Sequence, residues 1–223
     1  MKKQRNLIIL ITVFGCLCMG IVDAVIQPGY ITKSGIKIVL FLLLPILYAQ
    51  FDKSCDLKYL FRPGKKGILI ALGLGAAVYA VILGGYFLTR NIIDYSNVTS
   101  SLTSGMGITA ENFIYVSLYI SLMNSFLEEF FFRGYGFITL KKYTSRKVAY
   151  LFSSSLFAVY HIGMLVEMFH FGALLLLLLG LIVGGCIFNY LNERNDNIYP
   201  SWFVHMFANF AINTVGFILF GVL

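Results

Sequence analysis

Charge is scarce in this chain. Only 12% of the residues are Asp, Glu, Lys or Arg, and 59% are hydrophobic, whereas soluble domains carry about 25% charged and 45–50% apolar residues. This balance excludes an ordinary water-soluble domain and indicates a membrane protein. The net charge of +7 is therefore interpreted through membrane topology, so we expect a lipid bilayer as a partner and no nucleic acid.

Metal-binding and repeat signatures are missing as well. There is no His-Glu-x-x-His pattern, no internal repeat and no low-complexity segment. The four cysteines show no metal-ligand spacing, and three of them lie within apolar runs, where they are interpreted as small packing residues; they are Cys16, Cys18, Cys55 and Cys186. We therefore expect a single domain over residues 1–223.

Seven apolar runs predict an all-α, polytopic transmembrane bundle. The runs are Leu7 to Val25, Ile36 to Gln50, Gly67 to Leu88, Asn112 to Lys142, Lys147 to Leu165, Phe171 to Leu191 and Pro200 to Leu223. We interpret the first as a retained helix rather than a signal peptide, because its apolar character continues past Cys16. With the N-terminus inside, 14 of the 17 lysines and arginines are cytoplasmic. Only Lys33, Lys37 and Arg90 are left outside, which favours an N-in, C-out multi-pass protein of the cell membrane.

Three of these runs carry more specific expectations. The second contains Pro45 and is long enough only if Tyr30 and Ile31 contribute or the helix kinks. The third should make a close helix contact through its small residues, Gly73, Ala77 and Ala80. The fourth would measure about 46 Å as a helix, longer than a hydrocarbon core of roughly 30 Å. We therefore expect it to bend at Gly134 and Gly136.

Three charges interrupt the fourth run. Glu128, Glu129 and Arg133 lie within an apolar stretch, where an unpaired carboxylate costs several kcal/mol or more. Arg133 follows Glu129 by four residues, so the two share a helix face and can neutralise each other. Glu128 lies on another face without an obvious local partner, which makes it the candidate reactive group. Asn124, Ser125 and Ser121 share that face, so a polar stripe leads up to the carboxylate. A purely structural ion-pair cluster between helices is the alternative.

Further polar residues occur in later apolar runs. His161 lies in the fifth run, and His205 and Asn209 lie in the seventh at i,i+4 spacing, so they can address one small volume. Counted from the cytoplasmic lysines, Glu129 and His161 come out level, roughly 18 to 21 Å along their helices. His205 reaches that depth only if the turn before it dips into the protein.

This set of residues allows hydrolysis without a nucleophilic side chain. Desolvated Glu128 would act as a general base on a water molecule, assisted by His161, and His205 with Asn209 would donate hydrogen bonds to the developing oxyanion. Zinc catalysis is the rival chemistry, because two histidines and a glutamate form a known zinc ligand set. A non-enzymatic membrane protein, such as an immunity factor that binds a partner or a small transporter, is the competing class.

Three motifs occur in a specific order. Glu128-Glu129-x-x-x-Arg133, Phe157-x-x-x-His161 and His205-x-x-x-Asn209 resemble those of the CAAX prenyl protease and bacteriocin-processing family, often called the CPBP or Abi family. They lie in a motif-bearing core over residues 112–223.

The resemblance implies an integral-membrane endopeptidase of the glutamate type that acts on peptides or membrane proteins. It assigns water activation to Glu128, assistance to His161 and the oxyanion hole to His205 and Asn209. Glu129 with Arg133 would organise the site. No metal cofactor is expected, with zinc as the minority alternative. The resemblance does not choose between bacteriocin maturation and self-immunity, and it does not imply a prenylated substrate.

Overall fold

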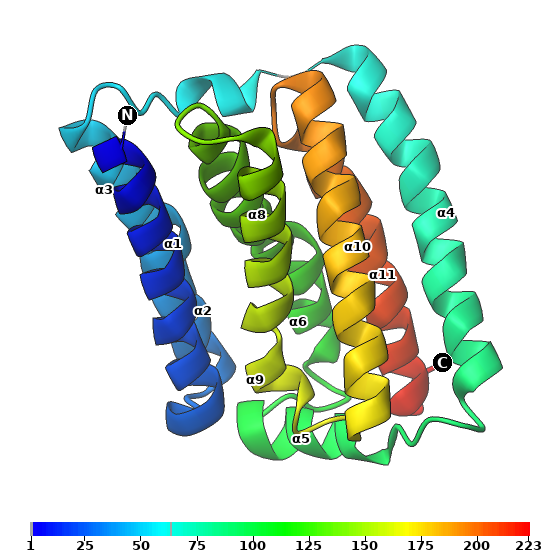
Figure 1. The fold of residues 1–223 in the computed structure, drawn as a ribbon. Helices are drawn as coiled ribbons and strands as arrows, with labels where there is room; N and C mark the ends of the chain where they lie inside the picture. Colours follow the sequence, from blue (N-terminus) through cyan, green and yellow to red (C-terminus); the bar gives the residue numbers. More distant parts are fainter. Residues whose placement is uncertain (1, 63) are drawn as a thin grey trace.

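The computed structural model describes residues 2–62 and 64–223. Within these residues the regular secondary structure is helical throughout, without a strand. The long helices stand side by side in one bundle, and the two termini lie at opposite ends of it (Figure 1). The predicted all-α transmembrane bundle is confirmed. The N-in, C-out orientation stays a prediction.

Six helices are long and apolar enough to cross a membrane. They are α1 with η1 (Lys2–Ile21 and Val22–Ile26), α2 with η2 and α3 (Tyr30–Ile38, Val39–Leu43 and Leu44–Phe51), α4 (Lys65–Thr89), α8 with α9 (Arg146–Tyr160 and Ile162–Leu165), α10 (Phe171–Asn195) and α11 (Tyr199–Leu219). Two short helices, η3 (Lys58–Phe61) and α5 (Ser96–Met106), lie at opposite ends of the bundle (Figure 1).

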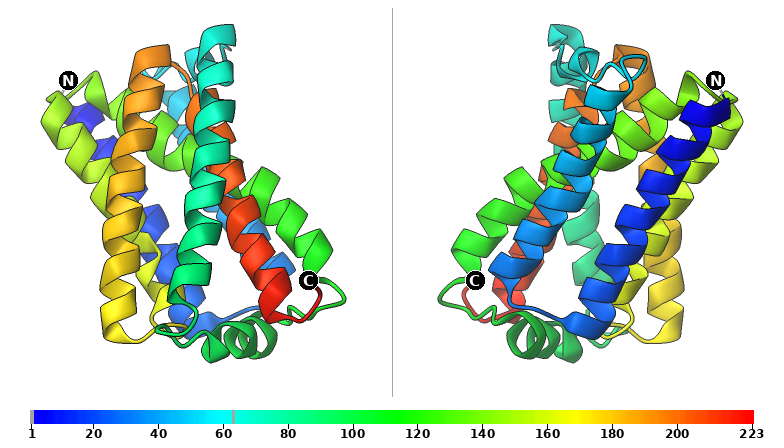
Figure 2. Two further views of the ribbon diagram at one scale, coloured as in Figure 1. Left: turned by 90° about the vertical axis from the view of Figure 1, so that its right-hand side faces the viewer. Right: turned by 90° about the vertical axis from the view of Figure 1, so that its left-hand side faces the viewer.

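The charged run forms a further helix that crosses the bundle obliquely (Figure 2). It consists of α6 (Phe113–Tyr119), η4 (Ile120–Asn124), α7 (Ser125–Glu128) and η5 (Glu129–Thr139). Every residue of η5 is buried, and this segment packs against α1, α8 and α10. With the six apolar helices it accounts for the seven predicted runs.

The helix does not break at Gly134 and Gly136, where the sequence predicted a bend, but continues through them as a π-helix. The backbone stays helical at the junctions on either side of η5, but η4 and η5 have the wider turns of a π-helix. Oblique packing also accommodates part of the length. Gly134 serves close packing instead of a break, because a Cβ there would lie 2.9 Å from Leu60 Cδ1.

The second run is a complete span because it starts early. Its helix begins at Tyr30 and continues to Phe51, which confirms that Tyr30 and Ile31 contribute. Pro45 lies in the first turn of α3, directly after the π-helical turn η2. Proline has no backbone N–H and cannot make the i→i−4 hydrogen bond of an α-helix. The wider turn of η2 comes directly before Pro45, so the helix continues through this position.

The small-residue contact predicted on α4 is wrong in its register. Gly73, Ala77 and Ala80 are exposed, and no atom would meet a Cβ added at Gly73. Gly75 makes the contact instead, because a Cβ there would lie 2.8 Å from Cγ of Phe207 on α11.

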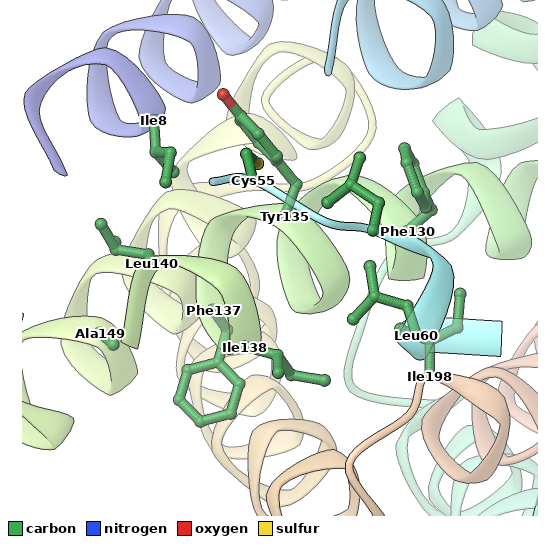
Figure 3. Close-up of a cluster of buried hydrophobic side chains, with 11 residues drawn as sticks. Ile8, Cys55, Leu60, Phe130, Tyr135, Phe137, Ile138, Leu140, Ala149 and Ile198 are labelled. Carbon is green, nitrogen blue, oxygen red and sulfur yellow. The ribbon is translucent and has the colours of Figure 1, made fainter. Parts of the chain in front are cut away.

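The turn between α10 and α11 lies inside the protein. Ile198 is fully buried, and its backbone N–H donates to the Leu60 carbonyl at 3.1 Å. Figure 3 shows Ile198 and Leu60 beside Phe130, one of the aromatic residues of η5. η3 therefore lies against this turn. His205, seven residues after Ile198, lies beside Glu128, 3.7 Å from its Oε2, which answers the question of depth that the sequence left open.

Candidate active site

Glu128 lies at the centre of the bundle and is held on one side by a lysine. Its side chain is 3% exposed, and its Oε1 atom lies 2.6 Å from Lys37 Nζ on α2. Asn124 lies one turn earlier and donates to the same oxygen at 3.1 Å, while its own Oδ1 accepts from Lys37 at 2.5 Å. Three polar groups therefore close into a ring around Oε1.

Two histidines approach the other oxygen of Glu128. His161 Nε2 lies 3.9 Å from Oε2, and His205 Nε2 lies 3.7 Å from it. Glu128 and His161 therefore lie at one depth, as expected from the level positions of Glu129 and His161, and His205, whose depth the sequence left open, lies beside them. Both distances exceed a direct hydrogen bond and suit a bridging water.

The other ring nitrogen of each histidine faces an acceptor. His161 Nδ1 lies 2.7 Å from the Phe157 carbonyl oxygen, and His205 Nδ1 lies 2.9 Å from Glu129 Oε1. A carbonyl and a carboxylate can only accept, so both Nδ1 atoms carry hydrogen. In the neutral rings both Nε2 atoms are then acceptors. The two Nε2 atoms and Glu128 Oε2 therefore face one another as acceptors, so a group that donates hydrogen bonds, such as a water molecule, can bind between them.

Glu129 and Arg133 form a second buried pair. Arg133 Nη1 lies 3.5 Å from Glu129 Oε1, and both side chains are 0% exposed, which fits the i,i+4 pairing predicted from the sequence. The guanidinium stacks on Phe157, 3.8 Å from the ring centroid, and lies 5.1 Å from that of Phe188. Glu129 therefore contacts both Arg133 and His205, and the pair holds the side of the imidazole ring that faces away from Glu128.

Asn209 points to a backbone group. Its Nδ2 donates to the Ile120 carbonyl at 3.0 Å, and this carbonyl lies at the start of the π-helical segment η4. Asn213 makes a similar contact one turn later, to the Ser117 carbonyl at 3.1 Å. An amide has two N–H donors, so one N–H of Asn209 remains for another acceptor. The described contacts do not join Asn209 directly to Glu128.

The polar residues on the face next to Glu128 make two kinds of contact, one with the carboxylate and one with the helix backbone and α11. Asn124 serves the carboxylate, but Ser125 bonds back along its helix to the Ser121 carbonyl at 2.5 Å, as serine in helices commonly does. Ser125 also accepts from Trp202 Nε1 at 3.1 Å. Trp202 therefore joins α11 to the central helix.

Lys37 contacts Glu128 but was not identified from the sequence as a residue of the site. It was assigned to an external position by its place near the end of a run, but it is only 5% exposed. Its ammonium group lies 5.1 Å from the ring centroid of Tyr160 and 5.5 Å from that of Phe41. The available signal was a lysine within the first turns of an apolar helix, where a charge is costly unless it is paired.

The donor atoms lie slightly farther apart than the ligands of a tetrahedral zinc ion. Ligands at 2.0–2.1 Å from a tetrahedral zinc lie about 3.4 Å apart, closer than the 3.7 and 3.9 Å found here. Lys37 also places a full positive charge on the same carboxylate. Within the part of the chain that the structure describes, no group of three His, Cys, Asp or Glu side chains could hold a metal ion.

The comparisons with known proteins point to one family. Residues 110–211 match the family model for Rce1-like proteins, described as type II CAAX prenyl endopeptidase Rce1-like. The match covers all three motifs and confirms the resemblance drawn from them. The searches of curated proteins and of solved structures gave no match.

Proposed function

We propose that this protein is an intramembrane endopeptidase of the glutamate class, because residues 110–211 match the family model for Rce1-like CAAX endopeptidases. It hydrolyses peptide bonds of membrane-associated peptides or proteins. The observation that carries the proposal is the convergence of Glu128 Oε2 with the Nε2 atoms of His161 and His205 at 3.7 to 3.9 Å. Such a triangle of acceptors accommodates one water molecule.

The attacking step uses this arrangement directly. A water molecule at this point donates one hydrogen to Glu128 Oε2 and the other to His161 Nε2. Glu128 takes the first proton as the water oxygen bonds to the scissile carbonyl carbon, and the carbonyl oxygen becomes an oxyanion. Glu128 then returns its proton to the leaving nitrogen as the C–N bond breaks. Atoms and charge balance without a metal ion.

Stabilisation of the oxyanion falls to α11. Asn209 supplies its second N–H. His205 joins it as a donor through Nε2 in the form of the site that carries one further proton, in which His161 alone accepts from the water. Glu129 orients the His205 ring, because its carboxylate accepts from Nδ1 at 2.9 Å, and the adjacent Arg133 pairs with Glu129 in turn. Donors that are fixed before the reaction contribute most to catalysis, since no reorganisation is needed in the transition state.

The substrate surroundings follow from the fold. The site lies inside a bundle with six helices able to cross a membrane, so its substrates are peptides or proteins within or at a bilayer. We place the protein in the cell membrane as a multi-pass protein. An immunity factor that only binds its partner would not need a water-activating carboxylate with two aligned histidines.

The test is a cleavage assay on purified protein in proteoliposomes. The probes are fluorogenic peptides ending in Cys-aliphatic-aliphatic-X, with and without a farnesyl group, and a pool of quenched transmembrane peptides. We expect turnover by the wild type and none by Glu128→Gln, which keeps size and most contacts. Glu193→Gln is the control, since Glu193 pairs with Arg146 and Lys141 away from the site. Equal activity of Glu128→Gln and wild type would refute the proposal.

A second experiment searches for natural substrates. Membrane proteins that accumulate in cells carrying Glu128→Gln, compared with cells carrying Glu193→Gln, are candidate substrates. The cleavage position in each then shows whether a prenylated cysteine is required.

A further inference from the structure

Lys37 comes from the part of the chain that carries no motif, and it lies outside the matched residues 110–211. It belongs to α2, which forms a hairpin with α1 at one side of the bundle (Figure 1). Its ammonium group nevertheless reaches Glu128 at 2.6 Å. This contact joins the N-terminal hairpin to the candidate active site.

We propose that Lys37 is a positioning residue of the active site, which orients Glu128 and balances its charge throughout the reaction. The inference rests on the proposed function, because it concerns the same carboxylate. Lys37 and Asn124 hold Oε1 at 2.6 and 3.1 Å. With Oε1 fixed, the carboxylate plane is set and Oε2 faces the two histidines. One oxygen therefore positions the group, and the other takes the proton.

The charge count of the buried site supports this role. Two carboxylates, Glu128 and Glu129, are matched by two cations, Lys37 and Arg133. Without Lys37 the resting site would hold an uncompensated negative charge in a medium that solvates charge poorly. When Glu128 takes a proton from water, the negative charge moves to the oxyanion a few ångströms away. Lys37 keeps its charge in both states, so it can balance the carboxylate first and the oxyanion next.

The chain offers a matched control on the same helix. Lys33 lies one turn before Lys37, and its Nζ pairs with Asp23 Oδ1 at 2.7 Å, with 14% and 4% of the two side chains exposed. Lys33→Met therefore strands a partly buried carboxylate as Lys37→Met does, but away from Glu128. A general loss of helix packing would affect both variants, whereas a positioning role affects only Lys37.

The experiment measures kcat and KM of the cleaved probe for Lys37→Met, Lys37→Arg, Lys33→Met and Asn124→Ala. We expect Lys37→Met to lower kcat on the order of 100-fold, as a misplaced catalytic group does, with KM changed less than about threefold. Lys37→Arg should regain at least a tenth of the wild-type kcat, because it keeps the charge. Lys33→Met should keep the wild-type kcat, and Asn124→Ala should lose about tenfold.

Wild-type kcat in Lys37→Met, or an equal loss in Lys33→Met, would overturn the proposal. If Lys37→Met does not fold, Asn124→Ala still tests the orientation of the same oxygen, and an unchanged kcat there has the same consequence.

A thermal double-mutant cycle of Lys37→Met and Glu128→Gln tests the ion pair without any substrate. We expect the double variant to unfold at a higher temperature than Lys37→Met alone, because no charge is left unpaired. Additive effects would refute the pairing, whatever the cleavage assay shows. If the wild type cleaves no probe while the cycle shows coupling, the proposed function fails and the pair stands.

Discussion

Replacing Arg133 by methionine should destabilise the protein far more than its place on one helix suggests. Arg133 Nη1 lies 3.5 Å from Glu129 Oε1 with both side chains fully buried. At that distance and an effective dielectric constant of about 20, the Coulomb attraction is about 5 kcal/mol. Removing one partner of a buried pair typically costs about 3–5 kcal/mol, because the remaining charge is stranded. We therefore expect a loss of about 4 kcal/mol.

The assay is thermal unfolding in detergent, followed by the intrinsic fluorescence of Trp202. For a chain of this size 1 kcal/mol corresponds to a Tm change of about 2–4 °C, so Arg133→Met should lower Tm by about 8–16 °C. Combining Arg133→Met with Glu129→Gln should recover part of this loss, because no charge is stranded and the introduced amide oxygen still accepts from His205.

The control is an ion pair at the surface. Arg146 pairs with Glu193 at 2.8 Å, but its side chain is 62% exposed, so Arg146→Met should cost no more than about 1 kcal/mol. If Arg133→Met lowered Tm no more than Arg146→Met, the buried pair would contribute nothing measurable. The inference that Glu129 and Arg133 organise the site would then be wrong.

The same geometry supports three further predictions. Glu128→Ala should abolish proteolysis and also lower Tm, because it strands Lys37; an unchanged Tm would show that the ammonium group reaches water without its partner. In a cysteine-free background, Lys58→Cys should be labelled only from the cytoplasm and Leu223→Cys only from outside, and cytoplasmic labelling of position 223 would overturn the N-in, C-out topology. Prolonged treatment with a zinc-selective chelator should leave cleavage unchanged, whereas loss of activity that added zinc restores would recast Glu128 and the two histidines as ligands.

The motif residues could be predicted because each is conspicuous in its surroundings. Glu128, Glu129 and Arg133 interrupt an apolar helix, and such charges remain there only with a structural or chemical reason. Spacing along one helix also predicted the Glu129–Arg133 pair found at 3.5 Å. These inferences needed no knowledge of which helices are neighbours.

The contacts between helices were harder to predict from the sequence. α4 is apolar on all sides, so nothing in its sequence distinguishes the lipid-facing side from the packed side. Its small residues suggested a contact through Gly73, but α11 packs on Gly75. The depth of His205 was open for a similar reason, because it depends on the burial of Ile198 beneath η3.

Lys37 shows most clearly what spacing along a chain cannot reveal. A lysine near the end of an apolar run has two physical explanations: it extends to the membrane surface, or it pairs with a buried acid. The count of positive charges on the two sides of the membrane favours a surface position, because lysines near helix ends usually lie at the membrane surface and indicate orientation. The second requires an acid at the same depth on a neighbouring helix, and Glu128 follows Lys37 by 91 positions in the chain.

The pairing also gives the motif-free helices a defined task. Residues 110–211 supply both carboxylates and Arg133, so on their own they leave one negative charge without a counter-ion at the site. α2 supplies the missing cation through Lys37, and the stacked rings of Phe41 and Phe131, 4.0 Å apart, fix that helix against η5. In the proposed mechanism Glu128 accepts a proton from water, and such a carboxylate needs a fixed orientation. The helix that carries Lys37 provides it, because Lys37 holds Oε1 of Glu128 at 2.6 Å and leaves Oε2 free for that reaction.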